Sequence, residues 1–137
     1  MPFVLQHETH ARRWVCALIV FALALAAIFA LAYLGRIPGI IAAVPHYDAY
    51  GHAILYGLLG YLAHRAWQRC TLVCGQVRVP LALPLTLTIA GIEEALQRLS
   101  PLRTASLRDI AWGAVGIVVA FVADAFWSHL RCPPCAR

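Results

Sequence analysis

The chain has 137 residues, of which 62% are hydrophobic and 12% are charged, and its formal net charge is +5. A water-soluble domain of this size usually has about 45–50% apolar and about 25% charged residues, so the composition argues against a soluble domain and for a membrane protein. The positive charge comes from arginines scattered between apolar runs, which form no basic helix face and so argue against a nucleic-acid partner.

The first apolar run covers residues 14–34 and contains no charged residue. About 20 apolar residues are enough to cross the hydrocarbon core of a bilayer as a helix. A secretory signal peptide is the alternative interpretation, because Arg12 and Arg13 precede the run. The apolar core of a signal peptide usually has only about 7–15 residues. Because further apolar runs also follow, we predict a membrane span.

Three further apolar runs are long enough to form helices. Gly57 and Gly60 would let another helix approach the second run closely. Pro84 is expected to bend the third run, which is tolerated in a span where neighbouring groups satisfy the freed carbonyl. Short loops between the runs favour an antiparallel bundle. We therefore predict an all-α integral membrane protein with a single domain, residues 1–137, and four transmembrane helices at about residues 14–34, 50–67, 79–97 and 110–127.

The arginines and tryptophans predict the orientation of this bundle. With a cytoplasmic N-terminus, the cytoplasmic segments hold seven arginines and the outer loops hold four, which agrees with the positive-inside rule. All four tryptophans lie at the ends of predicted spans, where aromatic side chains usually meet the membrane interface. We expect a multi-pass protein of the cell membrane with both termini in the cytoplasm.

The scarce polar residues gather at the predicted outer ends of spans two, three and four. Asp48 and His52 are four residues apart and share one helix face. Glu94 and Gln97 are three residues apart and also share a face, whereas Glu93 is rotated away by about 100°. Charged groups in hydrocarbon are costly, so these side chains should pair or face a wet cavity.

The loop before the fourth span adds two candidate residues. The planar guanidinium of Arg103 matches a phosphate or carboxylate, and the starts of spans two and four favour an anion. Structural roles are the alternatives: Asp109 fits a capping pattern with Ser106, and Arg103 could pair with Glu94. We predict one outer-face site, with His52 and Glu94 as catalytic candidates and Asp48, Gln97, Arg103 and Asp109 as ligand-binding residues.

These residues follow an ordered pattern along the chain: Asp48-x3-His52, Glu94-x2-Gln97 and Arg103-x2-Ser106-x2-Asp109, followed by Gly116. The pattern resembles that of VanZ-like membrane proteins and covers about half of the chain. The resemblance implies a small helical membrane protein, and it implies a link to low-level resistance to the glycopeptide teicoplanin. The chain departs from the family at Ala49, where a basic residue is usual, and at Gly113, where the usual asparagine would supply a hydrogen-bond donor and an acceptor.

The five cysteines fall in a predicted span or on the cytoplasmic side, so we expect reduced thiols. The tail contains Cys132 and Cys135 in a C-x-x-C pattern close to His129. A zinc site or a redox pair there are alternatives to an inert tail, which is our expectation.

Three functions remain open from the sequence. The first is a VanZ-like envelope protein that lowers sensitivity to a lipophilic glycopeptide through an anionic or lipid-linked ligand. The second is a membrane enzyme that acts on a phosphate or polyprenyl-phosphate headgroup, and the third is a non-catalytic packing subunit. We expect membrane lipid, an anionic lipid-linked ligand and a membrane-protein partner, and we expect no metal, no cofactor and no nucleic acid.

Overall fold

The chain is mostly helical in the computed structural model, which describes residues 2–101 and 106–131, and side chains for 11–101 and 106–128. A short helix, α2 (Gly39–Ala42), and a hairpin of two strands, β1 (Thr71–Cys74) and β2 (Val77–Pro80), join the longer elements. The prediction of a mainly helical protein is confirmed, although the hairpin was not expected. The long helices are α1 (Pro2–Tyr33), α3 (Tyr47–Ala66), α4 (Ala82–Gln97) and α5 (Leu107–Arg131).

The hairpin occupies the predicted start of the third span. Its strands pair antiparallel with Cys74 opposite Val77, and Gly75 adopts the positive φ of 63° that suits a tight two-residue turn. As a result, α4 begins at Ala82 rather than at about residue 79, and it has 16 residues. A helix of that length is about 24 Å long, which is shorter than a hydrocarbon core of about 30 Å.

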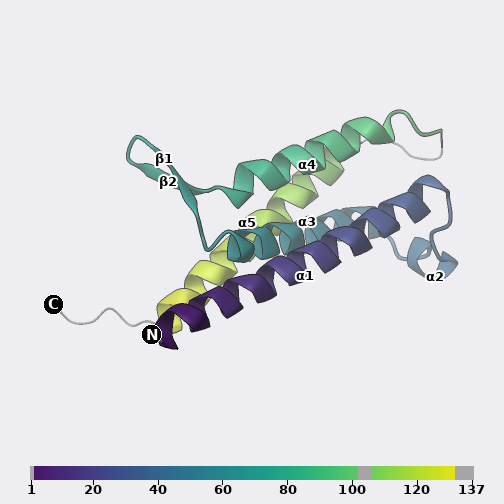
Figure 1. Ribbon diagram of the computed structural model, residues 1–137. Coiled ribbons are helices and arrows are strands. Elements are labelled where there is room, and N and C mark those ends of the chain that lie inside the picture. The colour runs from purple at the N-terminus through teal and green to yellow at the C-terminus, as the bar shows by residue number, and fades with distance from the viewer. Residues whose placement is uncertain (1, 102–105, 132–137) are drawn as a thin grey trace.

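Successive long helices run in opposite directions, so the start of α1 and the end of α5 lie at the same end of the bundle (Figure 1). The hairpin also lies at this end, which we call the hairpin end. The opposite end, where α3 and α5 begin and α4 ends, carries α2, and we call it the site end. α3 packs most extensively against α5, α1 packs against α3, and α4 contacts both α3 and α5.

The core lies between these four helices. Its central side chains are Leu25, Tyr56, Leu59, Ala90 and Ile117. The predicted close approach at Gly57 is confirmed, because a Cβ there would lie 2.8 Å from the backbone oxygen of Gly116. α3 and α5 therefore touch backbone to backbone, and this contact fixes where the residues at the start of α3 lie relative to α5.

Two described helical segments, Ala11–Tyr33 and Leu107–Ser128, are long and apolar enough to cross a membrane. In their most apolar stretches only 11% and 17% of the residues, respectively, are buried. Large apolar side chains such as Leu23, Val122 and Phe126 are consequently exposed, whereas a core helix of a soluble protein would bury such a face. The two segments support a membrane location, and membrane crossing by α3 and α4 stays a prediction.

Candidate functional site

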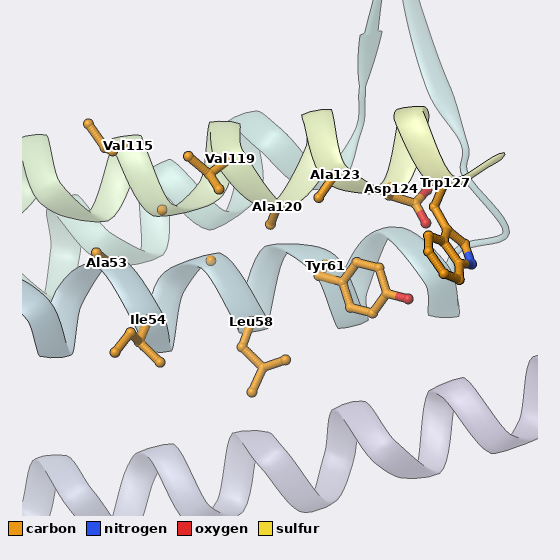
Figure 2. Close-up of a pocket in the computed structure, with 12 residues that line it drawn as sticks. Ala53, Ile54, Leu58, Tyr61, Val115, Val119, Ala120, Ala123, Asp124 and Trp127 are labelled. Carbon is orange, nitrogen blue, oxygen red and sulfur yellow. The ribbon is translucent and has the colours of Figure 1, made fainter. Parts of the chain in front are cut away.

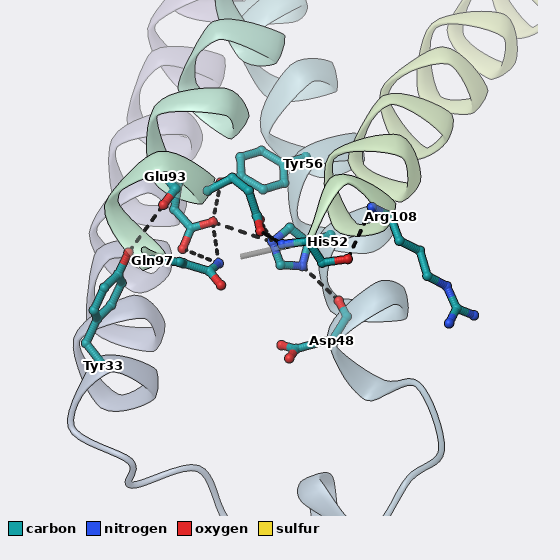
Figure 3. Close-up of polar contacts among 9 residues, drawn as sticks. Tyr33, Asp48, His52, Tyr56, Glu93, Gln97 and Arg108 are labelled. Carbon is teal, nitrogen blue, oxygen red and sulfur yellow. Dashed lines mark hydrogen bonds and ion pairs between the residues drawn. The ribbon is translucent and has the colours of Figure 1, made fainter. Parts of the chain in front are cut away.

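A buried group of polar side chains lies at the site end, between α3 and α4 (Figure 3). It consists of His52, Glu93, Glu94 and Gln97, each exposed by 7% or less, and we call these four residues the polar cluster. His52 Nε2 lies 3.4 Å from Glu93 Oε2 and 3.7 Å from Glu94 Oε2. The fold therefore brings together three of the residues that the sequence predicted, and it adds Glu93.

The imidazole of His52 is oriented by the first turn of α3. Its Nδ1 lies 2.9 Å from the backbone oxygen of Asp48, which can only accept a hydrogen bond, so Nδ1 carries a proton. This leaves Nε2 facing the two carboxylates. Glu94 Oε1 accepts a hydrogen bond from the backbone N–H of Ser106. Among the described residues, nothing hydrogen-bonds to the buried atoms His52 Nε2 and Glu94 Oε2.

Glu93 is the best-anchored member of the cluster. Gln97 Nε2 donates to both of its carboxylate oxygens, at 2.8 and 2.9 Å, and the Tyr56 hydroxyl donates to Oε2 at 3.4 Å. The hydroxyl of Tyr33 on α1 donates to the backbone oxygen of Glu93 at 3.3 Å. The predicted site did not include Glu93, whereas the structure places its carboxylate within the cluster. The buried face of a helix is wider than about 100°, so Glu93 and Glu94 both fit on it.

The start of α5 closes one side of the cluster. The hydroxyl oxygen of Ser106 accepts a hydrogen bond from the backbone N–H of Arg108 at 3.2 Å, so Ser106 caps the helix as predicted. Asp109 follows within the first turn and is buried, whereas the side chain of Arg108 is exposed and points away from the cluster (Figure 3). Arg103 lies outside the described residues, so its predicted role stays a prediction.

Three further residues lie near the polar cluster: Asp48, which was predicted to bind the ligand, and the two departures from the family pattern, Ala49 and Gly113. The carboxylate of Asp48 is directed toward the side of the cluster where Gln97 lies (Figure 3), and Ala49 is buried. A Cβ on Gly113 would lie 3.4 Å from Cδ2 of the Tyr56 ring. Tyr56 therefore fills the space beside Gly113 and supplies, through its hydroxyl, a hydrogen-bond donor to the cluster.

A second polar group, the Asp124 network, lies at the hairpin end. Asp124 of α5 accepts hydrogen bonds from Arg65 at 3.2 Å and from Arg69 at 3.0 Å. The positive φ of 60° at Arg69 turns the chain back after α3, and the Arg65 guanidinium lies 4.4 Å from the centre of the Trp14 ring. Asp124 of α5 is thus paired with two arginines, one in the last turn of α3 and one just after that helix.

Substitution of Asp124 by asparagine should lower the free energy of unfolding by about 1–3 kcal/mol, since two charge-assisted hydrogen bonds are weakened at a buried acceptor. The loss stays below the range for a fully buried pair because the Arg69 side chain is 42% exposed. Thermal unfolding in detergent, followed by circular dichroism, would measure the change. Ser128→Ala is the control, because among the described residues the Ser128 hydroxyl donates to the backbone oxygen of Ala125 within α5. Equal stability of the two variants would contradict the prediction.

Two apolar grooves run along the helices. The first, of about 730 Å³, lies between α3 and α5 and ends at Asp124 and Trp127 (Figure 2). The second, of about 610 Å³, lies between α1 and α4, and its lining includes Phe29, Leu96 and Glu93. The second groove therefore leads from an apolar surface to the polar cluster.

The three cysteines that the structure describes take no part in the polar cluster. Cys16, Cys70 and Cys74 are exposed free thiols. Cys132 and Cys135, with the proposed zinc or redox alternatives, lie outside the described residues, so those alternatives stay open.

Comparisons with known proteins assign no family to this chain: no protein-family model, curated protein or solved structure matches it. The resemblance to VanZ-like proteins depends on the ordered polar pattern alone and stays a prediction. The function must be inferred from the chemistry of the polar cluster, which combines one imidazole, two carboxylates and one amide in a buried position.

Proposed function

We propose that the chain is a VanZ-like, multi-pass protein of the cell membrane that binds the anionic headgroup of a lipid-linked ligand at the polar cluster and thereby lowers sensitivity to lipophilic glycopeptides such as teicoplanin. The observation that carries this proposal is the burial of His52, Glu93 and Glu94 side by side in a mainly apolar bundle. Ionisable groups are costly within a membrane, and they are found there mainly where they serve a ligand or an ion.

In the proposed topology, α1, α3, α4 and α5 all cross the membrane and both termini are cytoplasmic. The polar cluster then lies near the outer face and the Asp124 network near the inner face. The arginine distribution supports this orientation, as do the positions of Trp14 and Trp127 beside the Asp124 network. α4 is short for a span, but its polar end at Gln97 would lie in the wetter interface.

The groove between α1 and α4 supports a ligand that carries a lipid chain. It is lined mainly by apolar side chains, and Glu93 lies within its lining. An acyl or isoprenoid chain in this groove would bring its headgroup to the polar cluster. Membrane lipid and a lipid-linked ligand therefore share one entry route, from the side of the bundle.

The attraction for an anion must come from groups other than the carboxylates. We assign it to Arg103, whose planar guanidinium suits a phosphate, and to the partial positive charge at the start of α5. His52 and Glu94 would accept hydrogen bonds from hydroxyl or phosphate protons of the headgroup. A membrane-protein partner remains a further proposal, which no contact of the described residues addresses.

One observation favours a second candidate function, an enzyme that acts on a phosphate or polyprenyl-phosphate headgroup. His52 Nε2 and Glu94 Oε2 are both buried without a hydrogen bond from a described residue, and they lie 3.7 Å apart. Such atoms are suited to remove a proton from a water molecule that attacks a headgroup. Headgroup binding would be the first step of either function.

Arg103→Lys and Glu94→Gln should each abolish protection against teicoplanin while the protein remains in the membrane at normal abundance. Lysine keeps the charge but loses the planar fork, and glutamine removes the ionisable carboxylate at nearly constant volume. The measurement is the minimum inhibitory concentration of teicoplanin for one host strain that expresses each variant, together with membrane abundance.

Arg108→Lys is the matched control, because Arg108 is exposed and directed away from the cluster. It should keep full protection. Full protection by both site variants at normal abundance would overturn the proposed site. Parallel loss of abundance and protection would instead support the packing role.

A further inference from the structure

We propose that His52, Glu93 and Glu94 bind one divalent transition-metal ion through an imidazole nitrogen and two carboxylate oxygens. One ligand atom from each residue can be chosen so that all three lie within 4.8 Å of one another. The sequence led us to expect no metal, but that expectation left out Glu93, which completes the set of three. Cation binding at the cluster goes beyond the proposed function, since it can be measured without a lipid ligand.

The distances within the cluster suit a metal. Bonds of about 2.0–2.2 Å in a tetrahedral arrangement place neighbouring ligand atoms roughly 3.3–3.6 Å apart. His52 Nε2 lies 3.4 Å from Glu93 Oε2 and 3.7 Å from Glu94 Oε2. The chosen carboxylate oxygens of Glu93 and Glu94 lie within 4.8 Å of each other, so side-chain rotation would have to bring these two atoms to the tetrahedral separation.

The unused atoms point independently to a ligand between these residues. His52 is 7% exposed and Glu94 is 3% exposed, and their atoms Nε2 and Oε2 have no hydrogen-bond partner among the described residues. Buried polar atoms are rarely left unsatisfied in native proteins. A cation between them would satisfy both atoms and offset the negative charge of the neighbouring carboxylates.

Surrounding groups hold each ligand in the orientation that a metal requires. The backbone oxygen of Asp48 fixes the proton of His52 on Nδ1, which leaves the Nε2 lone pair available. Gln97 orients the carboxylate of Glu93, and the backbone N–H of Ser106 orients that of Glu94. Metal-binding histidines almost always donate their other N–H to a carbonyl, carboxylate or water in this way.

The ligand types favour zinc or a related transition metal over calcium and magnesium. Imidazole suits zinc and its neighbours, whereas calcium and magnesium prefer oxygen ligands alone. Three protein ligands also leave a fourth position open, as in zinc sites that bind a water or a substrate. If the proposed function holds, that open position would give an anionic headgroup a positive charge to bind; this consequence rests on the proposed function, but cation binding does not.

The test is calorimetric titration of the purified full-length chain with Zn²⁺ in detergent, without added lipid. The four cysteines predicted to be cytoplasmic, Cys70, Cys74, Cys132 and Cys135, are replaced by serine so that thiolates do not compete. One equivalent of zinc should bind. His52→Ala and Glu94→Gln should each weaken zinc binding by at least about tenfold, because each removes a metal ligand.

Glu8→Gln is the matched control: it removes one carboxylate near the start of α1, at the end of the bundle opposite the cluster, and should leave zinc affinity unchanged. Absence of one-to-one binding, or equal affinity in His52→Ala and the control, would overturn the proposal. If the site variants do not fold, X-ray absorption of the zinc-loaded chain decides instead. An imidazole nitrogen with oxygen ligands supports the site, and a ligand set without nitrogen overturns it.

Discussion

A Gly116→Ala substitution is expected to lower the free energy of unfolding by about 3 kcal/mol or more, at the upper end of the usual cost of overpacking. The new Cβ would fall directly on the backbone oxygen of Ala53 and would lie 2.6 Å from its carbonyl carbon and 2.8 Å from its Cα. Backbone atoms within a helix cannot rotate away as a side chain can. α3 and α5 would have to separate, which would loosen the fully buried side chains of Tyr56 and Ile117.

Gly91→Ala provides the matched control on α4. Apart from its two chain neighbours and the nearby backbone of α4, no described heavy atom lies within 4 Å of a Cβ at Gly91, and alanine is a better helix former than glycine by about 1 kcal/mol. This variant should be as stable as the parent or slightly more stable. Thermal unfolding of the variants in one detergent, followed by circular dichroism, measures the difference. Equal melting temperatures for Gly116→Ala and Gly91→Ala would contradict the backbone contact between α3 and α5.

The Gly116→Ala substitution should also affect the polar cluster. Ala53, which Gly116 contacts, directly follows His52 in α3. Separation of α3 from α5 would therefore move the imidazole relative to the carboxylates of α4. The close glycine contact between α3 and α5 thus helps to fix the position of the imidazole, because small residues let helix backbones approach closely.

The sequence predicts those parts of the fold that depend on long apolar runs. α1 and α5 contain the predicted spans 14–34 and 110–127 almost completely, because a run of that length has few alternatives to a helix. The hairpin was missed because its strands have only four residues each, and the end of β2 overlaps the predicted third span at Val79 and Pro80. Gly75, at the turn between β1 and β2, was a local signal for the hairpin.

The sequence predicted at which end of the bundle the polar cluster lies, but it did not predict which face of α4 is buried there. His52, Glu94 and Gln97 were expected at the end of the bundle where they lie, because the ends of the apolar runs fix their depth. The rotation of α4 is set by its buried face, which includes Thr86 and Ala90 and continues to Glu93. In a membrane the large apolar side chains can face lipid while small residues face the neighbouring helices, and this pattern of small residues was the signal that would have included Glu93.

The second large effect is expected when the buried hydrogen-bonded pair of Glu93 and Gln97 is broken by a single substitution. Glu93→Gln alone places an amide opposite the donors of Gln97 and Tyr56, which now bond to Glu93 at 2.8 to 3.4 Å. Gln97→Glu alone places a second carboxylate against Glu93 in a buried site. Each single variant should lose about 2–3 kcal/mol of unfolding free energy, since a buried hydrogen bond to a charged group is lost.

The double variant Glu93→Gln with Gln97→Glu restores one carboxylate and one amide, with donor and acceptor reversed. If the two substitutions were independent, their losses of unfolding free energy would add. The double variant should instead lose less than half of that sum. Its zinc affinity should stay at least about tenfold below that of the parent, because the carboxylate has moved one helical turn away from His52. Melting temperature and calorimetric titration on the same samples measure both quantities. Recovery of stability together with full zinc affinity would show that Glu93 only anchors α4, whereas failure to recover stability would show that the Glu93–Gln97 pair does not hold the helix end together.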